Sequence, residues 1–283
     1  MKITTHETEI AKYYRQTQNH YLKWWNLKKS LSLHYGIWDD NVKSFAESLE
    51  NTNKVLLETA QIKSSDKVLD AGCGVGGAAH YIHKLTGATV TGISLSPEQV
   101  TLANSVIYKK GLAKQLDFHV MNYCETSFEN ESFDVIWACE SICHATNKSN
   151  VIKECIRLLK PSGKLIMCDY FLTPQGENDT TGILRKWERA WSLSQLPSLP
   201  SFTNQLNNHF QKVKAWDYTS QIVKSSKRMY YASILGSIPS ELYNLSHPKV
   251  SQYAKNHYKS GIYQYQALKK RLWGYNVILA SKR

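Results

Sequence analysis

The chain has 283 residues, and its 42% hydrophobic content can supply a normal core for one large domain or for one domain with a cap. No run of about 18 apolar residues occurs, which argues against a membrane-spanning helix, and the first residues lack the apolar segment of a signal peptide, so we expect a cytoplasmic protein. The formal net charge is +12, and from His209 onward 13 Lys and Arg residues stand against only two acids, Asp217 and Glu241.

Residues 8–62 are rich in aromatic and apolar side chains and are expected to be helical, with the clearest helical spacing between Asn41 and Ala60. From Ser64 onward, strand patterns alternate with helical patterns, which favours a parallel, doubly wound sheet. The expected strands cover residues 67–71, 89–94, 116–121, 134–139, 164–171, 213–219 and 274–280.

The remaining segments predict helices around this sheet. We expect an N-terminal helical lid over residues 1–62 and an α/β core over residues 63–283, with helical cap insertions at about 175–208 and 221–271. These helical parts would form a substrate lid, although the same pattern would also suit helices that simply cover the sheet.

The stretch from Val68 to Gly77 predicts a buried strand, a tight turn and the start of a helix. Its glycines tolerate positive φ and let the backbone approach a ligand closely. The spacing of Gly72, Gly74 and Gly77 also fits a dinucleotide fingerprint. However, Asp70 just before the turn would repel a pyrophosphate at the helix N-terminus. The turn therefore favours a cationic cofactor that carries an amine and a sulfonium.

These residues resemble the first motif of the class I S-adenosylmethionine (SAM)-dependent methyltransferases. Three further stretches match the family in order, beginning at Thr91, Phe133 and Leu158. Within the class, the chain is similar to the sterol C-24, tocopherol and cyclopropane-fatty-acid methyltransferases, which share Ser94 in place of an acidic residue. The resemblance implies a seven-stranded Rossmann-like sheet with helical lid elements, SAM as cofactor and a small-molecule acceptor.

The resemblance also implies which residues hold the cofactor. The first-motif turn would hold the methionine part, Ser94 and Gln99 the ribose, and Asn122 the adenine, while the ring of Tyr35 could stabilise the sulfonium. Alternatively, the residues around Asp70 and Asn122 form ordinary turns, and the segment that contains Tyr35 is a packed aromatic turn without a ligand. The expected cofactor-binding residues are Tyr35, Asp70, Gly72, Cys73, Gly74, Ser94, Leu95, Gln99, Asn122, Tyr123 and Cys139.

Glu140 and His144 follow the fourth expected strand and are the candidate catalytic residues. Residues four apart share a face of a helical turn, and histidine is the natural proton acceptor near neutral pH. Alternatively, His144 only caps the turn and Glu140 holds an N-terminal helix in place. Cys139 and Cys143 lie nearby, but no second cluster completes a tetrahedral zinc site, so we predict no metal.

We therefore expect methyl transfer to carbon on an isoprenoid, sterol or aromatic lipid, under an aromatic lid whose ring faces could shelter a carbocation. The expected substrate-binding residues are Tyr14, Tyr21, Trp24, Trp25 and Trp38. N- or O-methylation of an amine or phenolic secondary metabolite is the main alternative. A dinucleotide oxidoreductase and a non-catalytic SAM-binding protein are two others.

The charge leaves the choice of macromolecular partner open. The basic C-terminal part would suit an anionic membrane surface or an anionic acceptor, and a solvated basic face is the plain alternative. Nucleic acid is disfavoured, because the fourth strand lacks an Asn/Asp-Pro-Pro-Tyr/Phe motif and no separate nucleic-acid-binding module is recognisable. Peripheral membrane contact and a homodimer are the remaining expectations.

Overall fold

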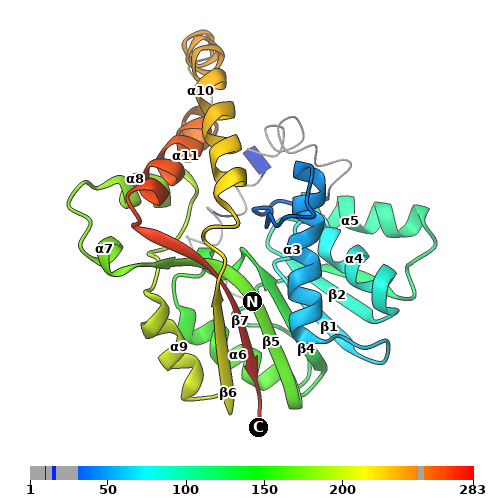
Figure 1. Cartoon of the computed structure of the whole chain (residues 1–283). Helices are drawn as coiled ribbons and strands as arrows, with labels where there is room; N and C mark the ends of the chain where they lie inside the picture. Colours follow the sequence, from blue (N-terminus) through cyan, green and yellow to red (C-terminus); the bar gives the residue numbers. More distant parts are fainter. Residues whose placement is uncertain (1–9, 11–14, 17–30, 248–251) are drawn as a thin grey trace.

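The computed structural model describes residues 10, 15–16, 31–247 and 252–283 (Figure 1). Seven strands form one sheet in the order β3-β2-β1-β4-β5-β7-β6. The strands are β1 Lys67–Ala71, β2 Thr89–Ser94, β3 Leu116–Val120, β4 Phe133–Cys139, β5 Leu159–Leu172, β6 Lys212–Asp217 and β7 Trp273–Ser281. The helices are α3 Phe45–Ala60, α4 Gly77–Thr86, α5 Pro97–Lys109, α6 Lys148–Leu158, α7 Pro174–Glu177, α8 Ile183–Ala190, α9 Leu199–Asn207, α10 Val223–Ser246 and α11 Gln252–Lys269.

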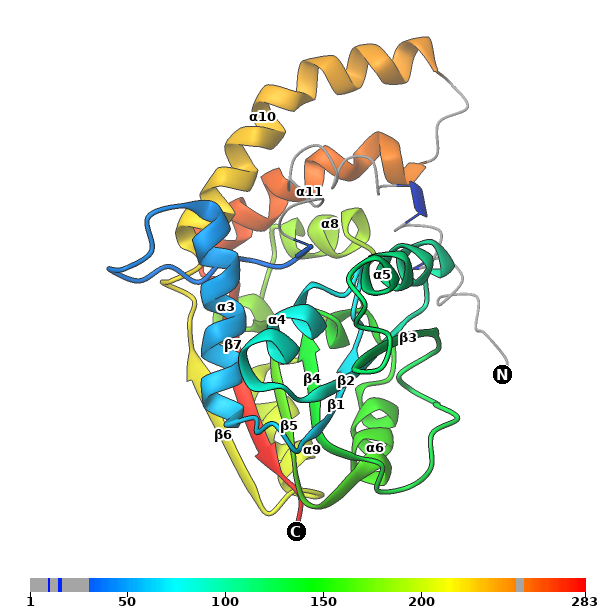
Figure 2. The same cartoon turned by 90° about the vertical axis from the view of Figure 1, so that its right-hand side faces the viewer.

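The sheet has a hydrophobic core on each face because its central strands alternate between the two faces. In β4, Val135 and Trp137 belong to the core under α3, α4 and α5, whereas Ile136 and Ala138 belong to the core under α6 and α9. Strands covered on both faces are expected to be apolar nearly throughout. The seven-stranded sheet that the sequence predicts is therefore confirmed, and α10 and α11 stand beyond the carboxyl end of β5 (Figure 2).

One strand runs against the expected direction. β7 pairs antiparallel with both β5 and β6, so the sheet is mixed rather than wholly parallel. The reason lies in the preceding helix, because α11 ends on the side of the sheet where β5 ends, and Trp273 pairs with Leu172 there. β7 can only run back from that edge. No helix among the described residues is long and apolar enough to cross a membrane.

The expectation of helix throughout residues 8–62 is wrong for the segment 31–39, which we call the strap. Its backbone amides bond to distant groups instead of to carbonyls four residues earlier. The amide of Tyr35 donates to Glu140, that of Gly36 to Ser225 and that of Ile37 to Thr52. These tertiary bonds satisfy the strap's amides in an extended form, and helix begins only at α3, which Ser44 caps.

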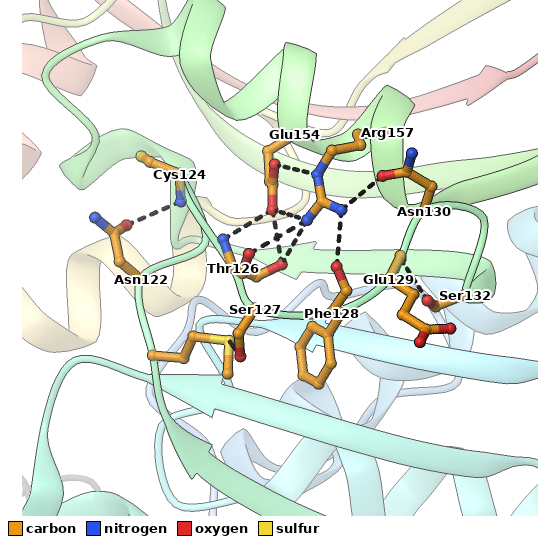
Figure 3. A network of polar contacts seen from close by, with 11 residues as sticks. Asn122, Cys124, Thr126, Ser127, Phe128, Glu129, Asn130, Ser132, Glu154 and Arg157 are labelled. Carbon is orange, nitrogen blue, oxygen red and sulfur yellow. Dashed lines mark hydrogen bonds and ion pairs between the residues drawn. The ribbon is translucent and has the colours of Figure 1, made fainter. Parts of the chain in front are cut away.

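The connection from β3 to β4 is held by a charged network (Figure 3). Glu154 of α6 accepts hydrogen bonds from the amide and the hydroxyl of Thr126, at 2.8 and 2.7 Å. Arg157 lies 2.7 Å from the same carboxylate and also donates to the carbonyl of Phe128. Burial raises the pKa of Glu154, but the hydrogen bonds from Arg157 and Thr126 lower it further, so the pKa lies below its ordinary value. The network therefore fixes the loop that follows β3.

Replacing the arginine of this network should destabilise the protein. In Arg157→Met the nearly buried Glu154 carboxylate loses its cationic partner, and we expect the free energy of unfolding to fall by about 2–4 kcal/mol at pH 7. Denaturant unfolding measures this loss. Lys153→Met, an exposed change on the same helix, is the control and should cost less than about 0.5 kcal/mol. Equal stability of the two variants would show that the network does not support the fold.

Candidate active site

A pocket opens at the carboxyl ends of the central strands, beside the point where the strand order reverses between β1 and β4. In open α/β sheets, ligands bind at such a switch point because the loops on its two sides diverge. The pocket is lined by the loops that follow β1, β2, β3 and β4. Residues 31–34 of the strap and Ile10 complete its wall.

The turn after β1 depends on glycine at two positions of close approach. A Cβ atom at Gly72, where φ is +98°, would lie 2.4 Å from the Ser141 side chain, and one at Gly77 would lie 2.1 Å from the Leu31 carbonyl oxygen. The amides of Gly72 and Cys73 both donate to the carbonyl of Ile93, at 3.0 and 2.9 Å. The expected residues Gly72, Cys73 and Gly74 all line the pocket.

Asp70 places a buried carboxylate in this pocket. Its residue surface is 2% exposed, and within the described part of the chain its Oδ2 atom has no hydrogen-bond partner. Burial raises the pKa of this carboxyl to about 7. An acceptor oxygen left in this state is costly by itself, and a cationic donor in the pocket would offset that cost.

His34 provides a second buried acceptor in the same pocket, and it is not among the predicted site residues. Its Nδ1 lies 2.9 Å from the carbonyl oxygen of Tyr35, so Nδ1 carries the hydrogen and Nε2 is the acceptor. Burial lowers the pKa of this imidazole to about 4, which keeps it neutral. Among the described residues, Nε2 has no hydrogen-bond partner. The sequence signal for His34 is its position directly before Tyr35, which the resemblance assigns to the cofactor.

The end of β2 supplies uncharged polar groups. The Ser94 hydroxyl donates to Oε1 of Gln99 at 2.8 Å, and the Ser96 amide donates to Ser94 at 3.1 Å. The structure therefore brings Ser94, Leu95 and Gln99 together at the pocket wall, with Ser96, the N-cap of α5, beside them. A hydroxyl paired with an amide can hydrogen-bond to the hydroxyls of a ligand without a carboxylate.

Glu140 follows β4 with a left-handed backbone, at φ +49°, and lines the pocket. Its Oε1 accepts from the amide of Tyr35 at 2.6 Å and from the hydroxyl of Tyr275 at 2.8 Å, and its Oε2 accepts from the hydroxyl of Tyr170. Burial raises the pKa of the carboxyl to about 8, although these three donors each lower it. Glu140 thus ionises in the range of a general base for neutral to mildly alkaline conditions.

The two tyrosines belong to an aromatic cluster around this carboxyl. Neighbouring ring centroids in the cluster lie between 4.7 and 6.1 Å apart. Its members are Tyr35, Tyr170, Trp187, Trp191, Trp273 and Tyr275. Glu140 therefore lies between the polar pocket and a wall of electron-rich rings.

His144 ends a short 3₁₀ helix, Ile142–His144, and lines the same pocket as Glu140. Its Nδ1 lies 3.0 Å from the carbonyl oxygen of Ser192, so Nδ1 carries the hydrogen and Nε2 is the basic nitrogen of the neutral ring. The two residues do not share one helical face as expected, because Glu140 precedes the 3₁₀ helix in a left-handed conformation. The fold brings them together nonetheless.

Two ionisable residues that the sequence did not predict, the buried Asp169 and the half-buried Lys148, hold the turn that carries His144. Oδ2 of Asp169 accepts from the Cys143 amide at 2.9 Å. Nζ of Lys148 donates to the carbonyl of Ala145 at 2.6 Å and to that of Cys143 at 3.3 Å. These residues make no contact with the pocket, and they act by positioning the turn.

Several expected site residues lie elsewhere. The Tyr35 ring belongs to the aromatic cluster, and its hydroxyl donates to Gln264 at 2.8 Å. Asn122 closes a turn by accepting from the Cys124 amide, whereas its neighbour Tyr123 lines the pocket, as Cys139 does. Trp38 donates to the Ser225 hydroxyl at the start of α10 and does not line the pocket. Tyr14, Tyr21, Trp24 and Trp25 lie outside the described residues.

Comparison with known proteins identifies a domain. Residues 69–167 match the family described as a methyltransferase domain. The chain is 30% identical over 179 residues to the methyltransferase GfsG of Streptomyces halstedii, which covers 62% of the chain and 64% of that protein. It is 36% identical over 135 residues to the sterol 24-C-methyltransferase ERG6A of Gibberella zeae, a match that covers 48% of this chain and 35% of that protein. It is 27% identical over 238 residues to the tocopherol O-methyltransferase of Arabidopsis thaliana, a match that covers 75% of this chain and 66% of that protein.

These relatives confirm the resemblance to sterol and tocopherol methyltransferases, although the chain spans between about one third and two thirds of their lengths. Among solved structures, geranyl diphosphate C-methyltransferase from Streptomyces coelicolor A3(2) superimposes with a TM-score of 0.76 at 16% identity. The match covers 99% of this chain and 98% of that one. At this identity the likeness establishes the fold.

The buried carboxylate of the pocket predicts a measurable effect on stability. Because the folded-state pKa of Asp70 is raised to about 7, its contribution is fully present below the unfolded pKa and is lost as the pH rises through 7. Asp70→Asn removes the group that must be neutralised or buried as a charge, so we expect it to stabilise the ligand-free protein by about 3–4 kcal/mol at pH 8 and by no more than about 1.5 kcal/mol at pH 5. Denaturant unfolding at both pH values measures the difference.

The exposed change Asp40→Asn is the matched control for Asp70→Asn and should leave stability within about 0.5 kcal/mol at both pH values. If Asp70→Asn destabilised the ligand-free protein at pH 8, the Asp70 carboxylate would be compensated and the interpretation wrong.

Proposed function

Residues 69–167 form a methyltransferase domain, and on this premise we propose that the chain is a SAM-dependent methyltransferase acting on a small, lipophilic acceptor. One observation carries the proposal. The pocket at the switch point contains Asp70, whose buried Oδ2 atom has no hydrogen-bond partner among the described residues, together with two groups that have acid–base capacity, Glu140 and His144. Such a pocket suits a cationic ligand and a reacting group that releases a proton.

The pocket's polar groups fit the parts of SAM. The acceptor atoms of Asp70 and His34 suit an ammonium group, which donates up to three hydrogen bonds. The glycine turn lets the backbone approach the methionine part, and Ser94 with Gln99 suits the ribose hydroxyls. When bound, SAM supplies a methyl group already activated by a positively charged sulfur. The chain's own residues must then align the acceptor, exclude water and accept any released proton.

Glu140 and His144 are the proposed proton acceptors. Ionised Glu140 is held by Tyr170 and Tyr275, and the hydrogen bond from Nδ1 of His144 to the Ser192 carbonyl makes its Nε2 the basic nitrogen. The rings of the aromatic cluster do not line the pocket, and the cluster acts on the site by fixing the Glu140 carboxylate through the hydroxyls of Tyr170 and Tyr275. This arrangement favours transfer to carbon on an isoprenoid, sterol or aromatic lipid.

The names of the relatives support a lipophilic acceptor while dividing on the acceptor atom. The sterol and geranyl diphosphate enzymes are named for transfer to carbon, and the tocopherol enzyme for transfer to oxygen. N- or O-methylation of an amine or phenolic metabolite is accordingly the second candidate. We also propose that the protein is cytoplasmic and makes peripheral contact with an anionic membrane, and the net charge of +12 supports the membrane contact. Nucleic acid is not a proposed partner, because the sequence lacks recognisable nucleic-acid-binding motifs.

Affinity for SAM should depend on the ionisation of Asp70. Because the carboxyl has a pKa of about 7, we expect wild-type affinity to rise between pH 6 and pH 7.5, below the ordinary pKa of an α-amino group. Asp70→Asn should bind about 10–100-fold more weakly at pH 7.5 and lose this rise. Titration calorimetry with SAM measures both effects, and Asp40→Asn is again the control. Equal affinities for wild type and Asp70→Asn would contradict the assigned role.

Methyl transfer should depend on Glu140 if carbon is the acceptor. With methyl-labelled SAM kept below saturation and a cell extract as acceptor source, we expect label to enter the organic phase at a rate that rises as the pH approaches 8, since Glu140 of the ligand-free enzyme must be ionised. Glu140→Gln should lower the rate by about 10²–10⁴-fold and remove this rise, and His144→Ala should also lower it.

The exposed change Glu129→Gln is the matched control for transfer and should leave the rate unchanged. Label in the aqueous phase would favour a polar amine or phenolic acceptor. Unchanged turnover in both Glu140→Gln and His144→Ala would contradict their catalytic assignment, and no transfer by a protein that binds SAM would favour a non-catalytic binding role.

A further inference from the structure

The outer part of α10 exposes a continuous line of large apolar side chains, which we call the α10 stripe. The members are Tyr231, Ile234, Leu235, Ile238, Leu242 and Leu245. In the same order, their exposed fractions are 53%, 42%, 77%, 71%, 62% and 79%. At about 100° per residue these positions share one face of the helix. Contiguous exposed apolar patches mark interaction surfaces, because a monomer that only needs to fold does not require them.

The opposite face of the helix is already occupied. α11 packs there so closely that a Cβ atom at Gly261 would lie 2.1 Å from the Ser233 hydroxyl and 3.0 Å from Met229. Both of these α10 residues are half a turn away from the α10 stripe. The helix projects away from the sheet in both views (Figure 1, Figure 2). The α10 stripe is therefore the side that the described residues leave uncovered.

The charges next to the α10 stripe indicate what it meets. Lys224 and Lys227 are exposed on the same face of α10, toward its start. The acid of this helix, Glu241, lies 3.7 Å from Lys259 and is offset by it. A helix with exposed apolar residues, flanked by lysines and nearly free of acids, suits a bilayer surface with anionic headgroups. A second copy of a chain with a net charge of +12 would bring like charges together.

The base of α10 is attached to the wall of the pocket. The Ser225 hydroxyl donates to the Gly36 carbonyl at 2.8 Å and accepts from the Gly36 amide at 3.1 Å. Gly36 belongs to the strap, which lines the pocket through residues 31–34. We propose that the α10 stripe docks on an anionic bilayer and holds the pocket beside the lipid from which the acceptor comes. The docking deepens the membrane contact of the proposed function by naming the surface that makes it, and the origin of the acceptor rests on the proposed methyl transfer.

Sedimentation with lipid vesicles tests the docking. We expect the full chain to bind vesicles of phosphatidylcholine with about 30% phosphatidylglycerol, and to bind less at raised salt. The triple variant Leu235→Glu, Ile238→Glu, Leu242→Glu should partition at least about tenfold more weakly, since it removes the inserted apolar groups. Leu85→Glu, an exposed change on α4, is the matched control and should bind as wild type does. Lys224→Gln with Lys227→Gln should lower binding to the anionic vesicles only.

Two further readouts separate the outcomes. SAM binding by calorimetry should be the same in wild type and in the triple variant, so a failure to bind SAM would count against the proposed function and leave the vesicle result valid. No binding to anionic vesicles, or equal binding by the triple variant, would overturn the docking. Light scattering that shows a dimer which the triple variant dissociates would also overturn it, because the α10 stripe would then join two copies.

Discussion

The site depends on the close packing of the turn after β1 against the turn after β4. The Ser141 hydroxyl donates to the Ala71 carbonyl at 2.6 Å, and the space beside Gly72 is too small for a Cβ atom. The two strands are neighbours with parallel directions, so both turns fall on one edge of the sheet. A side chain at position 72 would push the β4 turn away. Because Glu140 directly precedes Ser141, the position of Glu140 and the glycine turn after β1 depend on the same contact.

The electrostatics of the pocket follow from burial more than from pairing. Burial raises the pKa of both Asp70 and Glu140, to about 7 and about 8, so the ligand-free site disfavours two negative charges. A cation bound in the same pocket would favour the ionised form of both carboxyls. Under the proposed function, binding of the cofactor thus promotes the form of Glu140 that can accept a proton. Under the same proposal, the free energy cost of burying the Asp70 and Glu140 carboxylates would be reduced when the cation binds.

The sequence predicts the sheet and the first-motif turn well because both are locally encoded. Short, nearly continuous apolar runs followed by turn residues define the central strands, and the glycines from Gly72 to Gly77 indicate the tight turn by their own identities. The strap could not be predicted in this way, because its amides bond to Glu140 and to Thr52, far away in the chain. The same holds for the direction of β7, which depends on where α11 ends. His34 was missed because only the fold shows that its Nε2 is buried and unsatisfied.

The strap also joins the parts of the molecule that the site requires. The amide of Tyr35 bonds to Glu140, its hydroxyl bonds to Gln264 of α11, and the next residue, Gly36, bonds to Ser225 of α10. Gln264 in turn accepts from Ser226 and donates to its carbonyl, so α10 and α11 share this connection. Since these groups are buried or half-buried, breaking one of the bonds leaves a polar atom with reduced access to water. α10 therefore cannot shift alone: its displacement must carry the strap with it, and the strap holds the carboxylate proposed to accept the proton.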